Sequence, residues 1–429
     1  MRPEVVVWLV RDSCRLQDNP ALVRAAELAR ATGAGLVPLV CLEPRRWADQ
    51  QFGLSRIGSH WARFRIQALL ELESALNFED SALWISADEP DRALELIQEH
   101  MRVIHVVTDL PLATEERLEN AKLESEGYLL SAVETNDLFR AAQLPFDLDE
   151  LPSTFTQFRK TIERAPALLP PLPQAQPVLP PLPAQPWARP SEWHEAVLAV
   201  TQPSRSSMEG GRTPSLAHWH RYLEAKALSH YKLTRNAFEG LHQSSELSAG
   251  LAHGCLSARE IWHDTLAYES RVGANESTYW LRFELLWREY FRWYSRASDW
   301  TLFRRTGPAD RSVAGDFQAT RFRAWSDGST GCDIVDAAMR ELLATGWMSN
   351  RARQLVASHC IYESGLDWRL GAAWFESQLI DHDVASNWGN WAYIAGVGPD
   401  PRGGRVFNLD QQAARYDPNA TYRDRWLVS

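Results

Sequence analysis

Four short segments in the second half of the 429-residue chain carry polar and charged side chains next to aromatic or apolar ones. Hydroxyl groups dominate the first segment, carboxylate and guanidinium groups the second, amide and guanidinium groups the third, and carboxylate and amide groups the fourth. The segments are 231–248 (YKLTRNAFEGLHQSSELS), 283–290 (FELLWREY), 346–354 (GWMSNRARQ) and 379–391 (LIDHDVASNWGNW). The third segment offers no base suited to proton transfer, which favours ligand binding there over acid–base catalysis.

Three serines of the first segment, Ser244, Ser245 and Ser248, precede an apolar stretch at 251–261 that we expect to be helical. A serine at a helix start caps free backbone N–H groups, and such N–H groups together with the positive end of the helix dipole also bind phosphate. Serine caps are common on helices that bind nothing. The segment is therefore either an ordinary cap or a phosphate cradle.

Glu284 and Arg288 of the second segment are four residues apart, the spacing of an ordinary ion pair on a helix surface. Their neighbours are aromatic, however, because 279–296 places ring and leucine side chains at three- and four-residue spacings. An ion pair on such a buried face more often orients a ligand than stabilises a fold. Both interpretations stay open on the residues alone.

The fourth segment contains Asp381, His382 and Asp383, a combination that raises the question of a metal site. Nothing nearby in the sequence completes a set of metal ligands, so we expect no metal. Carboxylates that face the N–H edge of a flat heterocycle are a better use of this segment. Asn350 and Arg353, which share one helix face, would add hydrogen-bond donors.

The elements that position these segments are predicted to be helices. From residue 215 onward the hydrophobic residues recur with a helical period, glycines interrupt the pattern, and strand-like runs disappear. We therefore expect an all-helical domain over 211–429. Fifteen of the 19 tryptophans lie from Trp187 onward, where they serve either as a bulky core or as a site that stacks flat rings or moves electrons.

The first 135 residues alternate between short apolar runs and helical patterns. The apolar runs are 5–10, 36–42, 83–86, 103–108 and 128–133, and the helical patterns are 21–30, 57–76, 91–100 and 115–125. This alternation predicts an α/β domain over 1–135, with a five-stranded parallel sheet covered by helices on both faces. No GxGxxG motif follows the first run, which excludes a standard dinucleotide-binding domain.

Residues 136–210 are predicted to form a long proline-rich linker, because 166–190 holds ten of the 24 prolines. Proline lacks the backbone N–H that regular structure needs, so we expect an extended connector. At about 3.1 Å per residue the proline-rich part could reach roughly 75 Å, enough to pass around a domain.

Composition narrows the class of protein. The chain is 45% hydrophobic and 23% charged, which is ordinary globular usage, and the apolar run Val5–Val10 is far shorter than the roughly 20 residues of a membrane helix. Five scattered cysteines and the absence of a signal-peptide pattern fit a cytoplasmic protein. We also expect no membrane contact and a monomer. With a net charge of −10, any nucleic-acid partner must be held by a local patch.

In this order, after an α/β half, the segments resemble the photolyase/cryptochrome family and in particular its cryptochrome-DASH branch. The resemblance rests on YKLTRN, NESTYWLRFELLWREYF, TGWMSNRARQ, DWRLGAAWFESQLIDHDVASNWGNW, AGVGPDPR and YDPNATY, and it covers nearly the whole chain. It implies a photolyase-like fold whose helical domain holds FAD. It also implies that blue light excites the reduced flavin, which splits a cyclobutane pyrimidine dimer flipped out of DNA by giving it an electron. The branch is associated with single-stranded DNA, from which a base is flipped at least cost.

The resemblance implies two sets of FAD contacts. The phosphates and the ribityl chain would be held by Tyr231, Ser244, Ser245, Leu247 and Ser248, and the ring by Arg288, Asn350, Arg353, Asp381 and Asp383. Arg353 and Asp381 are expected to form an ion pair beside the ring. Asn387 would face the flavin N5 as a neutral amide, which tolerates an electron-rich ring better than a carboxylate does.

The resemblance also implies a lesion site and an electron route. Glu284, Trp287 and Gln354 would line the lesion cavity, Tyr393, Arg292, Arg351 and Arg402 would contact DNA, and Glu284, Asn387, Trp391 and Trp368 would be catalytic. Between 288 and 323 there are eight arginines against four acidic residues. Taken alone, such a run of charges is typical of an ordinary solvent-exposed face. Taken together with the resemblance to the family, it predicts a rim of the cavity that contacts DNA phosphates.

Two departures from the family pattern limit these implications. Gly315 stands where the outer tryptophan of the electron chain is expected, with Trp300, Trp325 or Tyr393 as possible substitutes. Pro111 stands where an acidic residue usually holds a methenyltetrahydrofolate antenna, which makes that antenna doubtful. The alternative function is a blue-light photoreceptor that signals through partners and has little repair activity.

Overall fold

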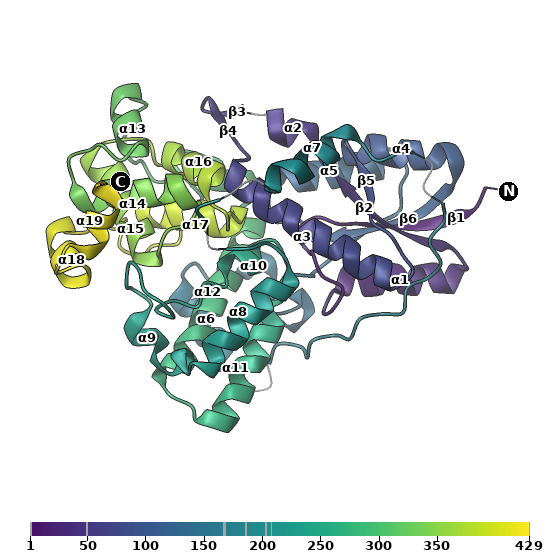
Figure 1. The fold of residues 1–429 in the computed structure, drawn as a ribbon, viewed down its shortest axis with the longest axis horizontal. Coiled ribbons are helices and arrows are strands. Elements are labelled where there is room, and N and C mark those ends of the chain that lie inside the picture. The colour runs from purple at the N-terminus through teal and green to yellow at the C-terminus, as the bar shows by residue number, and fades with distance from the viewer. Residues whose placement is uncertain are drawn as a thin grey trace.

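The computed structural model describes residues 2–48, 50–165, 169–184, 187–201, 204–206 and 208–428. It shows an α/β part and a helical part (Figure 1). The five sheet strands are β1 (Glu4–Leu9), β2 (Gly35–Cys41), β5 (Trp84–Ser86), β6 (Arg102–Asp109) and β7 (Leu130–Val133). They are parallel and follow the order β5-β2-β1-β6-β7 across the sheet. The predicted five-stranded parallel sheet is confirmed.

Both faces of the sheet are buried, which explains why its strands lack polar alternation. Val6 and Trp8 of β1 pack with α1 (Pro20–Thr32) and α3 (Ser59–Phe78). Val5 and Val7 point to the other face and pack with α4 (Pro90–His100) and α5 (Thr114–Ser125). The predicted helices on both faces are confirmed.

One small feature of the α/β part could not be predicted from the sequence. A five-residue helix, α2 (Pro44–Ala48), is followed by a two-stranded hairpin of β3 (Gln50–Gln51) and β4 (Leu54–Ser55). Elements of this length show no measurable periodicity.

The predicted linker 136–210 contains two helices as well as an extended segment. α6 (Phe155–Glu163) packs in the helical part, and α7 (Ser191–Val200) buries Trp193 in the same cluster as α3. The described proline-rich residues between them are extended and follow the outside of the α/β part (Figure 1). Backbone hydrogen bonds from Asp18 N to Gln174 O and from Leu36 N to Pro181 O fix this course.

The helical part contains no strand among the described residues from 215 onward. Its helices are α8 (Arg212–Glu224), α9 (Tyr231–Thr234), α10 (Ser248–Ala252), α11 (Ala258–Val272), α12 (Glu276–Ser298), α13 (Ala319–Ser326), α14 (Asp333–Thr345), α15 (Asn350–Ser358), α16 (Trp368–Gln378), α17 (Val384–Ala395), α18 (Leu409–Tyr416) and α19 (Thr421–Leu427). The expected all-helical architecture is confirmed. None of the described helices is long and apolar enough to cross a membrane.

The expectation of one helix over 251–261 is wrong. α10 ends at Ala252 and α11 begins at Ala258, because Gly254 adopts a left-handed conformation (φ +64°) against the backbone of Asp12, where any side chain would collide. Ser244, Ser245 and Ser248 are not side-chain caps either. α10 begins at Ser248, and no side-chain hydrogen bond caps it. The capping serine is Ser257, whose Oγ accepts a hydrogen bond from Arg259 N at the start of α11.

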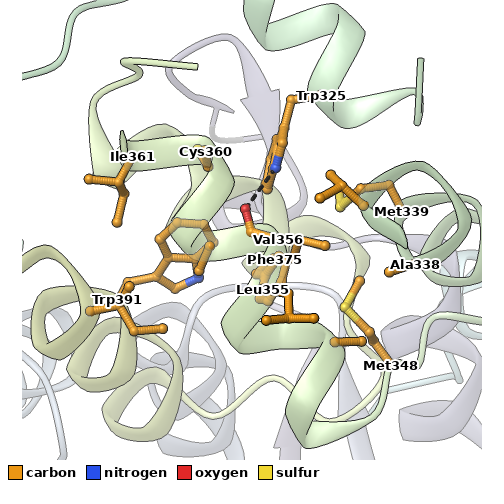
Figure 2. Close-up of a cluster of buried hydrophobic side chains, with 14 of the residues drawn as sticks. Trp325, Ala338, Met339, Met348, Leu355, Val356, Cys360, Ile361, Phe375 and Trp391 are labelled. Atoms are coloured by element: carbon orange, nitrogen blue, oxygen red, sulfur yellow. Dashed lines mark hydrogen bonds between the residues drawn. The ribbon is translucent and has the colours of Figure 1, made fainter. Parts of the chain in front are cut away.

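Much of the tryptophan excess is core. Trp325, Trp368, Trp388 and Trp391 are buried in a cluster of α13–α17 side chains. Figure 2 shows Trp325 donating to Val356 O, a hydrogen bond of 3.0 Å, and Trp391 belongs to the same cluster, its ring centre 6.0 Å from that of Trp325. The stacking and electron-transfer interpretation therefore applies at most to those tryptophans that also face a ligand site.

Candidate functional site

A cavity of about 290 Å³ lies within the helical part, between α12, α15 and α17. Every residue that the sequence predicted to bind the cofactor lines it. These are Tyr231, Ser244, Ser245, Leu247, Ser248, Arg288, Asn350, Arg353, Asp381, Asp383 and Asn387. Glu284, Gln354 and Trp391 line the same cavity. Residues separated by more than 150 positions in the sequence thus share one wall.

Arg353 and Asp381 form the expected ion pair. Arg353 stands on α15, its Nη2 lies 2.8 Å from Asp381 Oδ2, and its Nε donates to Met348 O over 2.8 Å. The side chain of Asp381 is buried, and its second oxygen, Oδ1, has no hydrogen-bond partner among the described residues. A buried carboxylate oxygen in a cavity wall normally has a partner, so this atom indicates a ligand with a donor group.

Asp383 and Asn387 stand one turn apart at the start of α17. Asp383 caps the helix by accepting from Ser386 N over 2.7 Å, and Asn387 donates through Nδ2 to Ala372 O over 2.9 Å. Burial opposes the charge on Asp383, but Arg292 and Arg288 outweigh it and lower the pKa of this carboxyl group. The cavity wall therefore holds a charged acceptor next to a fixed neutral amide.

Glu284 and Arg288 line the cavity from α12 but do not pair with each other. Glu284 Oε1 lies 2.9 Å from Nη2 of Arg235, and Arg288 donates to Asn136 O over 2.8 Å. The surface ion pair that their spacing allowed is thus absent. Burial raises the pKa of Glu284, against the effect of Arg235, and lowers the pKa of Arg288 to about 10.

The comparisons with known proteins agree with this geometry. Residues 5–180 match the family model "DNA photolyase", and residues 280–429 match "FAD binding domain of DNA photolyase". The cryptochrome DASH of Idiomarina loihiensis is 41% identical over 98% of this chain and 92% of its own length. That of Vibrio parahaemolyticus is 40% identical over 99% of this chain and 94% of its own length. The chain belongs to the cryptochrome DASH branch of the photolyase family.

Solved structures confirm the photolyase-like fold. The crystal structure of a Synechocystis cryptochrome has a TM-score of 0.91 at 34% identity and covers all of this chain and 89% of that one. A bacterial class III photolyase from Agrobacterium tumefaciens has a TM-score of 0.82 at 26% identity, with coverages of 100% and 87%.

The cavity of this cryptochrome DASH chain fits FAD, the cofactor of its FAD-binding domain. The wall combines serine hydroxyls with cationic, carboxylate and amide groups, as a ligand with phosphates, a polyol and a heterocycle requires. The free oxygen of Asp381 is the sharpest sign, because a cavity filled with protein or built for an apolar ligand would not leave it unpaired.

The two predicted electron-transfer tryptophans occupy different positions. Trp391 lines the cavity, whereas Trp368 is buried without lining it. Trp368 donates to Arg305 O over 3.0 Å, and its ring centre lies 5.8 Å from that of Trp388. Gly315 cannot be replaced by a larger residue, since its φ is +122° and a Cβ would collide with Leu366 O.

Of the three suggested substitutes, Trp325 contacts Trp391 but is fully buried. Its ring centre is 6.0 Å from that of Trp391, whereas Trp300 is 56% exposed and Tyr393 contacts Trp287.

One predicted DNA contact is wrong. Arg292 is buried, with 4% of its surface exposed, and it pairs with Asp137 and Asp383 inside the molecule. Sequence reasoning placed it on a DNA-facing rim because nothing in the pattern of α12 distinguishes a buried arginine from an exposed one.

Of the other predicted DNA and lesion contacts, Glu284 and Gln354 line the cavity, whereas Trp287, Tyr393, Arg351 and Arg402 do not. Trp287 stacks on Phe155 with 3.7 Å between ring centres, and Tyr393 meets Trp287 edge-on at 5.6 Å. Arg351 donates to Gln354 Oε1 over 3.0 Å, and Arg402 is exposed. Among the lining residues missed from the sequence is Arg235, which the YKLTRN motif contained and which pairs with Glu284.

The predicted arginine rim is only partly internal, since Arg292 and Arg296 are buried and Arg288 half-buried, whereas Arg305, Arg311, Arg321 and Arg323 are exposed. Among its eight members Arg288, Arg292 and Arg296 donate to buried partners, and Arg311 donates to the carbonyls of Gly396 and Asp400. These guanidinium groups bind partners within the protein. The number of arginines in this stretch of sequence therefore overstated the positive charge available for DNA at the surface.

The shifted acidic residue near the expected antenna position is also engaged. Asp109 is buried at the end of β6 and accepts from Asp12 N over 3.0 Å, and burial raises its pKa. The methenyltetrahydrofolate antenna therefore stays doubtful.

Proposed function

We propose that this protein is a light-driven lyase that repairs cyclobutane pyrimidine dimers, preferentially in single-stranded DNA. The observation that carries the proposal is the position of Glu284, a carboxyl group paired with Arg235, in the same cavity wall as the FAD-binding set. When bound and reduced, FAD supplies an electron to the lesion on absorption of blue light.

The residues of the chain would hold the lesion and exclude water. The Arg235 pair fixes the direction of the Glu284 carboxyl group, which can hydrogen-bond the edge of a flipped thymine. Trp287 and Tyr393 would provide an aromatic contact next to it, and Gln354 a neutral amide in the wall. Arg351 and Arg402 would contact the phosphates. A single strand is favoured because unstacking then costs least.

The proposal is tested by illuminating the reduced holoprotein with a single-stranded oligonucleotide that contains one dimer. We expect loss of the dimer under blue light and none in the dark. Glu284→Gln should slow the loss by about tenfold or more, because the hydrogen bond to the lesion is weakened. Glu276→Gln is the matched control, since this glutamate lies on the same helix but pairs with Lys232 in solvent. Persistence of the dimer in the FAD-loaded natural chain contradicts the proposal.

A signalling photoreceptor is the second candidate, and one observation favours it. Phe155 covers a face of Trp287, the ring expected to stack on the lesion. A receptor of this kind should change its binding to a partner protein on illumination, and that change should survive Glu284→Gln. Dimer repair by the natural chain that Glu284→Gln slows by about tenfold or more favours the lyase over the receptor.

A further inference from the structure

Arg292 lies between the cavity wall and the segment that follows β7. It stands on α12 one turn after Arg288, almost fully buried. Its Nε donates to Asp137 Oδ1 over 2.8 Å, and its Nη1 lies 3.5 Å from Asp383 Oδ2. The guanidinium group of Arg292 thus joins Asp137, which does not line the cavity, to Asp383, which does.

Asp137 is the fixed end of this arrangement. Its side chain is fully buried, and Arg296 donates to its two oxygens over 2.8 and 2.9 Å. Arg259 also donates to its backbone oxygen over 2.7 Å. A carboxylate held from several sides defines where the Arg292 guanidinium group must sit.

Asp383 is the dependent end. Its Oδ1 accepts from Ser386 N, so Arg292 is the charged group that holds its other oxygen. Burial alone would favour the neutral acid, and Arg292 and then Arg288 reverse that preference and lower the pKa of Asp383.

The other titratable groups around this cluster cannot replace Arg292. His382 is the neighbour of Asp383 in the chain, and burial lowers its pKa so that it is mainly neutral at pH 7. Asp137 and Glu289 are acidic and oppose a negative charge on Asp383. Arg288 also lowers the pKa of Asp383, but its backbone-carbonyl partners direct it elsewhere.

We propose that Arg292, itself fixed by Asp137, is a positioning residue that keeps the Asp383 carboxylate charged and oriented to accept hydrogen bonds from a ligand in the cavity. The inference rests on the proposed role of Asp383 in binding FAD. Arg292 does not line the cavity and acts only through Asp383.

The test is the retention of FAD by the purified holoprotein after desalting at different pH values. In Arg292→Gln we expect normal retention at about pH 8 and a loss of affinity of up to about tenfold per pH unit once Asp383 gains a proton. Arg282→Gln is the matched control, because it removes an arginine–carboxylate pair of the same helix, that with Glu269, without touching Asp137 or Asp383. Its profile should follow that of the natural chain. Adding Asp383→Asn to Arg292→Gln removes the titrating group and should abolish the slope.

A flat profile for Arg292→Gln, or equal slopes in Arg292→Gln and Arg282→Gln, overturns the inference. If Arg292→Gln does not fold, as judged by circular dichroism, Arg292→Lys takes its place. Lysine keeps the charge but cannot bridge both carboxylates with one planar group. We therefore expect the FAD affinity of Arg292→Lys to fall with decreasing pH less steeply than that of Arg292→Gln. A profile without any slope would contradict the inference. A natural chain that retains no FAD at any pH instead contradicts the proposed function.

Discussion

The residue on which the cavity wall depends most is Arg353, because it neutralises the buried charge of Asp381. The Asp381 side chain is 1% exposed and the Arg353 side chain 26%, so solvent can partly screen the charge of Arg353 but not that of Asp381. Arg353→Met leaves an uncompensated buried carboxylate and should lower the free energy of unfolding by about 3 kcal/mol. Asp381→Asn leaves no buried charge and should cost less. Urea unfolding of both variants measures this order, and a larger loss for Asp381→Asn contradicts it.

At the scale of single residues, the sequence predicted which residues line the cavity better than it predicted which residues are exposed to solvent. Motifs such as TGWMSNRARQ place residues like Asn350 and Arg353 on one helix face, and the structure places them in one wall. Burial, however, depends on what packs against the helix. Arg292 follows Arg288 by one turn, but the segment that carries Asp137 covers it, and no local pattern contains that information.

At the scale of elements, α14 and α19 meet at a buried acid. Glu341 of α14 accepts from the hydroxyl of Tyr422 on α19 over 2.6 Å, and burial raises the pKa of Glu341 from 4.5 to about 8. Since the folded chain holds this proton more tightly, the stabilisation is complete below about pH 4.5 and is lost as the pH rises through about 8. The free energy of unfolding should fall by up to about 1.4 kcal/mol per pH unit in this window.

Glu341→Gln keeps the hydrogen bond to Tyr422 but cannot ionise, so it should lack this component of the pH dependence. Urea unfolding of the natural chain and of Glu341→Gln at about pH 5 and about pH 8 compares the two slopes. Identical slopes would show that Glu341 does not titrate in this range.

Many of the longer elements followed from hydrophobic periodicity. All five sheet strands and α1, α3, α4, α5 and α12 lie where the sequence pattern predicts them. The pattern failed at 251–261, where the contact of Gly254 with the backbone of Asp12 divides an apolar stretch into two helices. Such a contact joins residues far apart in sequence, so no local signal reports it.

At the scale of the whole molecule, buried arginines join the α/β part to the helical part. Arg259 of α11 pairs with Asp18 over 2.9 Å, and α12 donates to the segment after β7 through Arg288, Arg292 and Arg296. The same helix α12 therefore forms the cavity wall on one side and the joint between the two parts on the other. Composition predicted an arginine-rich chain but could not show that many of its guanidinium groups face inward.

The central claim is that the cavity within the helical part holds FAD, and the most direct measurement is the FAD content of the purified protein. FAD released by denaturation and quantified by chromatography against the chain concentration should give one FAD per chain, and the native protein should absorb blue light. A colourless protein that takes up no FAD on reconstitution, while its circular dichroism shows it to be folded, would contradict the account.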